Sequence, residues 1–81
     1  MSQRDKFRQK LLGKQADQNI DFATLCSFLK RLGFEEDING SHHLYGMTGI
    51  REIIDLQPRI DGKAKAYQVK QVRQIIQDYG L

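Results

Sequence analysis

Three parts of the chain carry hydrophobic residues at the spacing of an amphipathic helix. Phe7 and Leu11, four residues apart, lie on one helix face and predict a short helix over residues 5–12. Similar apolar stripes predict helices over residues 22–32 and 67–79.

The helix predicted over residues 22–32 has signals at both ends. Asn19 or Asp21 can cap its first turn, because a short polar side chain accepts hydrogen bonds from free backbone N–H groups there. Gly33 follows its last apolar residue and is typical of a helix end.

Between this helix and the last one, the pattern changes to that of β-strands. We expect strands over residues 34–38, 41–45 and 52–56. Asn39 and Gly40 join the first two strands and are a strong hairpin signal, since both residues accept the positive φ of a type I′ turn.

The resulting order α-α-β-β-β-α predicts an α+β fold, with a three-stranded antiparallel sheet packed on helices. A chain of 81 residues is enough for one domain with one modest core. Within that domain, residues 1–21 form an N-terminal helical extension and connector, and residues 22–81 form the core.

Charge and composition point to a partner class. The net charge is +3, and basic residues gather over residues 1–14 and 58–73. Two basic patches suggest a polyanionic partner, nucleic acid before membrane, although charges that merely solubilise the surface explain them equally well. We expect no membrane association and a cytoplasmic protein, because no apolar run could cross a bilayer and Cys26 has no cysteine to pair with.

The sequence NGSHHLYG contains the only two histidines of the chain, His42 and His43. Neighbouring strand residues point to opposite faces, so these two cannot both reach one site. This argues against a two-histidine metal centre, and we expect no metal and no cofactor. We expect Tyr45, and His43 on its face, to lie toward the helices, which leaves His42 on the open face. Two ordinary strand histidines are the alternative.

Histidine suits one reaction in particular, because an imidazole can take and return a proton near neutral pH. In RNA, a base that removes the 2′-OH proton lets that oxygen attack the neighbouring phosphorus. Positioned acid–base groups contribute roughly 10²–10⁴-fold to such a step. The general acid stays open among Tyr45, Lys63, Lys65 and water.

The run GSHHLYG resembles the Gly-Ser-His motif of HicA-type toxins, small mRNA-cleaving ribonucleases of toxin–antitoxin systems. LCSFLKRLGFEEDINGSHH is similar to the first helix and hairpin of that family, and GKAKAYQVKQVRQIIQDYGL to its Gly-Lys loop and C-terminal helix. The resemblance covers residues 22–81 and implies a double-stranded-RNA-binding-like fold. Residues 5–12 lie outside the family core, and QPRIDGKAKAYQ departs from its usual loop.

The resemblance implies a role for each matched residue. His42 would be the catalytic histidine, Gly40 would support the tight approach to the strand, and Ser41 would help to orient the loop. The family acts on mRNA, needs no metal, and is neutralised by a HicB-type antitoxin protein that covers the active site.

RNA would lie along the start of the last helix, where free N–H groups and the helix dipole favour phosphate. Lys63 and Lys65 precede that helix, and Lys70 and Arg73 lie one turn further along it. A non-catalytic RNA-binding module on the same fold, and a protein-interaction domain, are the rival interpretations.

Overall fold

A computed structural model describes residues 2–81 and gives the element order expected from the sequence. Three helices and a three-stranded antiparallel sheet follow one another as α-α-β-β-β-α, so the predicted α+β class is confirmed. The elements are α1 (Gln3–Leu12), the short 3-10 helix η1 (Asp17–Asn19), α2 (Phe22–Leu32), β1 (Glu35–Asn39), β2 (His42–Gly46), β3 (Ile54–Leu56) and α3 (Ala66–Tyr79).

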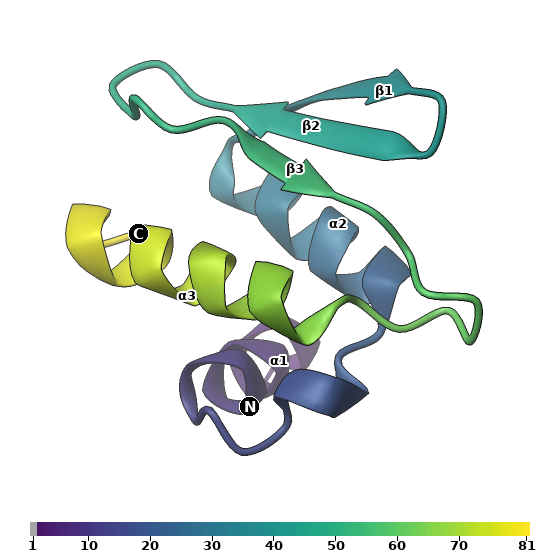
Figure 1. Cartoon of the computed structure of the whole chain (residues 1–81). Helices are drawn as coiled ribbons and strands as arrows, with labels where there is room; N and C mark the ends of the chain where they lie inside the picture. Colours follow the sequence, from purple (N-terminus) through teal and green to yellow (C-terminus); the bar gives the residue numbers. More distant parts are fainter. Residues whose placement is uncertain (1) are drawn as a thin grey trace.

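The elements are stacked in three layers (Figure 1). The sheet lies over α2 and α3, and α1 lies on the other side of these two helices. The strand order is β1-β2-β3, with β2 in the middle and antiparallel to both neighbours. Each side chain of β2 therefore points either toward the two helices or toward solvent.

Both ends of α2 follow from local chemistry. The Asp21 carboxylate accepts a hydrogen bond from Thr24 N at 3.0 Å, so Asp21 rather than Asn19 is the cap. Gly33 ends the helix with a φ of +111°, a conformation that glycine adopts without the steric cost of a Cβ atom.

The hairpin between β1 and β2 differs from the sequence prediction. Asn39 pairs with His42, so the two turn residues are Gly40 and Ser41. Gly40 has a φ of +64°, whereas Ser41 is not among the described residues with positive φ. Glycine at the first central position alone is the requirement of a type II′ turn, so the type I′ turn predicted at Asn39-Gly40 is wrong. Ser41 belongs to the turn, and β2 begins at His42.

One core joins the extension to the rest of the chain. Tyr45 is fully buried against the helices, which confirms the predicted direction of that side chain. Leu11 and Ile20, from the segment predicted as extension and connector, are also fully buried in the same hydrophobic cluster. Residues 2–21 therefore contribute to the core, because without Leu11 and Ile20 part of the cluster would be exposed to water.

The position of Arg73 contradicts the prediction made from the sequence. Arg73 was expected on the outer face of the last helix, as an RNA-binding residue, but only 6% of it is exposed. Its guanidinium donates to both carboxylate oxygens of Asp17, at 2.7 and 2.9 Å, and to the carbonyl oxygen of Leu11 at 3.1 Å. Arg73 follows Val69 by four residues and therefore shares its buried face. Because its guanidinium is buried and paired with Asp17, Arg73 is a structural residue rather than a phosphate ligand.

The structure also bears on the membrane question. Over residues 2–81, no helix combines the length and the apolar character that crossing a membrane would require.

We expect Asp17→Asn to lower the free energy of unfolding by about 3 kcal/mol at neutral pH, because it leaves a buried arginine charge without its partner. The hydrogen bond from Arg73 is the main reason that the pKa of Asp17 lies below its ordinary value of 3.8. In the unfolded chain, Asp17 is therefore protonated at a higher pH than in the folded protein. The stabilisation is complete well above pH 3.8 and is lost as the pH falls through the lower folded pKa.

Urea unfolding of the wild type and of Asp17→Asn between neutral pH and acid checks this expectation. The difference between the two should be largest at neutral pH and shrink below pH 4, as estimated from the linkage relation. Asp37→Asn, at an exposed position of β1, is the control and should change little. An Asp17→Asn protein as stable as the wild type at neutral pH would contradict the role given to the ion pair.

Candidate functional site

His42 lies where the sequence placed it, on the solvent face of the sheet. It is the first residue of β2 and about half of its side chain is exposed. His43, the next residue, points to the other face, where its ring meets the edge of Phe22 at a centroid distance of 5.0 Å. The two histidines therefore belong to different surroundings, as strand alternation requires.

Asp55 of β3 holds the imidazole of His42. The Nδ1 atom lies 3.1 and 3.0 Å from the two carboxylate oxygens. Leu44 and Asp55 are register partners, so Asp55 is diagonal to His42 on the same sheet face. A carboxylate only accepts hydrogen bonds, so Nδ1 carries the proton and Nε2 of the neutral ring is left with its lone pair.

Gln57 connects this pair to the start of α3. Its side-chain nitrogen lies 3.0 Å from Nδ1 and 2.9 Å from Nε2 of His42. One amide nitrogen cannot lie along the axes of both ring nitrogens, and Nδ1 already faces Asp55, so we assign the hydrogen bond to Nε2. The Oε1 atom of Gln57 accepts from Lys65 Nζ at 2.8 Å, and its backbone N–H donates to Gln68 Oε1 at 3.0 Å.

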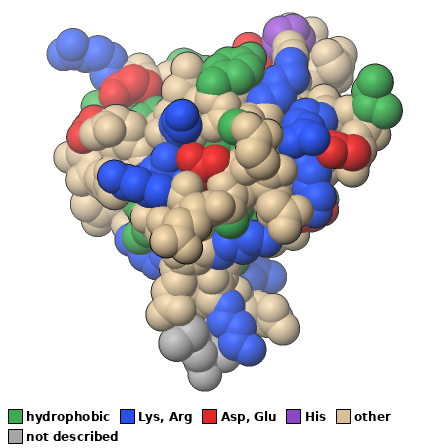
Figure 2. All heavy atoms as spheres, turned by 60° about the horizontal axis from the view of Figure 1, so that its bottom comes forward, with side chains coloured by type: hydrophobic (Ala, Val, Ile, Leu, Met, Phe, Trp, Pro, Cys, Tyr) green, Lys and Arg blue, Asp and Glu red, His purple; other side chains and the backbone are tan. Residues whose placement is uncertain are grey.

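Positive charge gathers beside this group. Figure 2 shows lysine and arginine side chains clustered close to a histidine near the upper right of the view. Lys63 and Lys65 lie in the loop between β3 and α3, and Lys65 is the N-terminal cap residue of α3. No side chain caps the first turn of α3, so its N–H groups and the positive end of its dipole add to the charge of the lysines.

The other predicted site residues are spread more widely. Gly40 and Ser41 form the exposed turn just before His42. Lys70 is exposed, and its charge helps to lower the pKa of Asp17, so it lies toward η1. Gln68 accepts a hydrogen bond from Gln57 next to the sheet, and residues two positions apart, such as Gln68 and Lys70, lie on roughly opposite sides of a helix. Lys70 therefore does not face His42.

Two residues of the group were missed by the sequence analysis. Asp55 and Gln57 join His42 only because β3 is paired with β2 in one register. The alternation of Asp55 and Gln57 around a buried Leu56 was a signal that both lie on the open face. Tyr45, named as a possible general acid, is excluded because it is buried on the opposite face and donates to Glu36 at 2.6 Å.

The arrangement can do acid–base chemistry at a negatively charged substrate. Asp55 orients the imidazole of His42 and fixes its tautomer, so that Nε2 can act as a base. Lys65 places a positive charge nearby, because its Nζ atom is hydrogen-bonded to Gln57, and Gln57 in turn contacts the ring. The chain was also compared with known protein families, with curated proteins and with solved structures, and none of them matched.

We expect ¹⁵N NMR at neutral to alkaline pH to find His42 mainly in the tautomer that carries its proton on Nδ1. The reason is the Asp55 carboxylate at 3.0 Å, which accepts that proton in a hydrogen bond. Asp55→Asn should mix the two tautomers and leave the ring signals of His43 in place. A wild-type ring protonated mainly on Nε2 would contradict the assigned orientation.

Proposed function

We propose that the protein is an endoribonuclease of the HicA toxin type, which cleaves mRNA with His42 as its general base or acid. The observation that carries the proposal is the exposed His42–Asp55 pair beside Lys65 and the start of α3. The Gly-Ser-His run and its surroundings in the sequence support the family assignment. We further propose that it acts in the cytoplasm, where mRNA is translated.

The chemistry uses the nucleophile that RNA carries. Nε2 of His42 takes the proton of a 2′-OH, and the oxygen forms a bond to the adjacent phosphorus. The bond from phosphorus to the 5′ oxygen breaks, which leaves a 2′,3′-cyclic phosphate and a 5′-OH. The proton for the leaving oxygen comes from Lys65, Lys63 or water. No metal takes part in these steps, because the base and the nucleophile are both present.

Asp55 and Gln57 have separate roles in this scheme. The Asp55 carboxylate keeps Nδ1 protonated and stabilises the imidazolium that forms when Nε2 takes up a proton. The Gln57 amide, 2.9 Å from Nε2, leaves that position when the 2′-OH arrives and is then free to donate to a phosphate oxygen.

RNA binding would rest on the loop before α3. Lys63 and Lys65 stand next to the N–H groups of the first turn, where a phosphate is favoured by both charge and dipole. Lys70 offers a further cation on the outer side of α3, one turn away. Folds of the double-stranded-RNA-binding kind recognise RNA mainly by shape and backbone, so little base specificity is expected from these residues.

A HicB-type antitoxin would neutralise the enzyme by covering the open face of the sheet. His42, Asp55 and the turn at Gly40 all lie exposed on the side of the sheet away from α2 and α3. A partner seated there would block the approach of RNA to Nε2 without a change of fold.

A cleavage assay tests the catalytic role directly. In excess EDTA, the wild type should cut RNA and leave a 2′,3′-cyclic phosphate, and His43→Ala should still cut. His42→Ala should lose roughly 10²–10⁴-fold in rate, the usual contribution of a positioned acid–base group. Asp55→Asn should lower the cleavage rate less than His42→Ala does, because it disturbs the orientation of the imidazole but leaves the imidazole in place.

Binding of uncleaved RNA by His42→Ala, measured beside its cleavage rate, separates catalysis from recognition. If His42→Ala binds RNA as tightly as the wild type but no longer cleaves it, the catalytic role of His42 is supported. If no variant and no wild type cuts RNA but all bind it, the protein is a non-catalytic RNA-binding module, and the contact of Gln57 with His42 is purely structural.

The salt dependence of RNA affinity tests the proposed surface. Lys63→Gln and Lys65→Gln should each lower the slope of log affinity against log salt by about 1, since each removes one phosphate contact. Lys6→Gln, at an exposed position in the first half of α1, is the matched control and should keep the slope. Equal loss with Lys6→Gln would show that the affinity comes from diffuse charge instead.

A further inference from the structure

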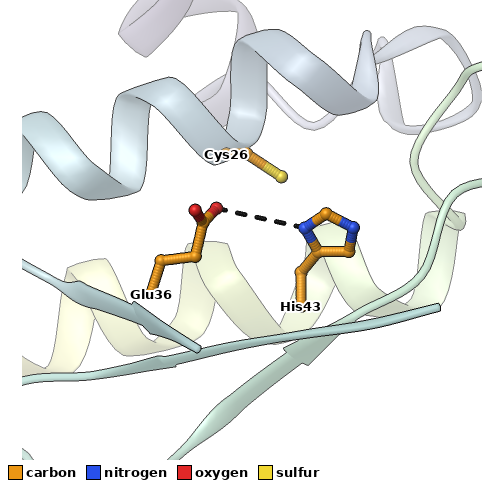
Figure 3. Close-up of side chains that lie close together, drawn as sticks. All are labelled: Cys26, Glu36 and His43. Atoms are coloured by element: carbon orange, nitrogen blue, oxygen red, sulfur yellow. Dashed lines mark ion pairs between the residues drawn. The ribbon is translucent and has the colours of Figure 1, made fainter. Parts of the chain in front are cut away.

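A second group of chemically active side chains lies on the helix side of the sheet. Cys26 of α2, Glu36 of β1 and His43 of β2 point toward one another across the space between α2 and the sheet (Figure 3). Their sulfur, oxygen and nitrogen donor atoms all lie within 4.8 Å of one another. The residues come from three elements, so the group depends on the tertiary fold.

His43 shows that this group has unused binding capacity. Its Nδ1 atom is buried and has no hydrogen-bond partner among residues 2–81. The nearest charged atom is Glu36 Oε2 at 3.9 Å, which is too long for a hydrogen bond. A buried polar atom without a partner costs about 1–3 kcal/mol, and a bound ion is one of the ways in which proteins recover that cost.

We propose that Cys26, Glu36 and His43 bind a zinc ion. A thiolate, an imidazole and a carboxylate form a ligand set that Zn²⁺ accepts, with bonds of about 2.0–2.3 Å. In a tetrahedron, such bonds place neighbouring ligand atoms roughly 3.3–3.7 Å apart. The Nδ1 and Oε2 atoms are 3.9 Å apart, a little more than that spacing, and the other donor atoms need to approach one another by roughly 1.5 Å at most.

The surroundings of the three ligands fit this site. Tyr45 donates to Glu36 Oε2 at 2.6 Å, which orients the carboxylate as a second-shell hydrogen bond does in metal sites. The same hydrogen bond is the main reason that the pKa of Glu36 is lowered, so a charged ligand is ready. The side chains of Glu36 and His43 are 21% and 23% exposed, which gives an ion a path and leaves room for water as the fourth ligand.

Two features of the site set its affinity. Burial raises the pKa of the Cys26 thiol, so the ion must displace a proton from sulfur as the S–Zn bond forms. Lys30 lies 3.6 Å from Glu36 Oε1, and its positive charge opposes a cation. Competition with the proton on Cys26 weakens zinc binding further as the pH falls, and both features make the site weaker than one built from several cysteines.

The zinc site is independent of the proposed cleavage reaction. His43 and His42 are neighbours in β2 but point to opposite faces, so the ion would not reach the RNA. Its effect would be mechanical, since it joins α2, β1 and β2 behind the strand that carries His42. Loss of cleavage and loss of zinc binding would therefore come from different variants.

The experiment measures uptake of Zn²⁺ by the full chain in equilibrium dialysis, with Co²⁺ as a spectroscopic probe. The wild type should take up one equivalent, and its cobalt form should show thiolate-to-metal charge-transfer absorption in the near ultraviolet. Cys26→Ser should abolish that absorption, and His43→Gln should lower the affinity roughly 100-fold or more, given that second-shell changes alone cost 10–100-fold.

His42→Ala is the matched control, because it removes a histidine from the same strand but from the other face, and it should keep full uptake. Circular dichroism of each variant in EDTA checks that it is folded. A folded wild type that takes up no metal, or a cobalt spectrum without a thiolate band, overturns the proposal. The same holds if Cys26→Ser binds zinc as tightly as the wild type, since the three side chains would then form only a hydrogen-bonded part of the core.

Discussion

The alternation of side chains along β2 is the constraint on which both sites depend. β2 is the middle strand, so its register is fixed by β1 on one side and β3 on the other. His42 is thereby held against Asp55 in solvent, while His43 is held against Glu36 and Cys26 under the sheet. A slip of one residue would exchange the two histidines and destroy both groups at once.

The ion pair of Arg73 and Asp17 has a similar effect on the other side of the helices. It fastens η1 to α3, and Arg73 also binds the carbonyl of Leu11 at the end of α1. The segment that the sequence marks as an extension therefore completes the core. It also changes the proposed RNA surface, because it removes Arg73 from that surface, whereas Lys65 stays linked to His42 through Gln57.

The proposed catalytic group combines one residue that the sequence indicates with two that only the fold brings to it. The sequence pointed to His42 through strand alternation and through the resemblance of its surroundings to HicA-type toxins. It could not supply Asp55 and Gln57, which are separated from His42 by the whole of the loop between β2 and β3. Asp55 and Gln57 come close to His42 because of the register between β2 and β3, and no local sequence pattern specifies that register. The proposed zinc ligands could not be predicted from the sequence for the same reason, since Cys26 lies on a helix and Glu36 and His43 lie on strands.

Patterns along the chain were enough to predict the order and type of the elements, the Gly33 end of α2 and the outward direction of His42. All of these follow from periodicity and local hydrogen bonding, which act over a few residues. The burial of Arg73, the turn at Gly40-Ser41 and the partners of both histidines became known only from the folded chain. These depend on which distant residues the packing brings together, and a helical or strand period does not record that.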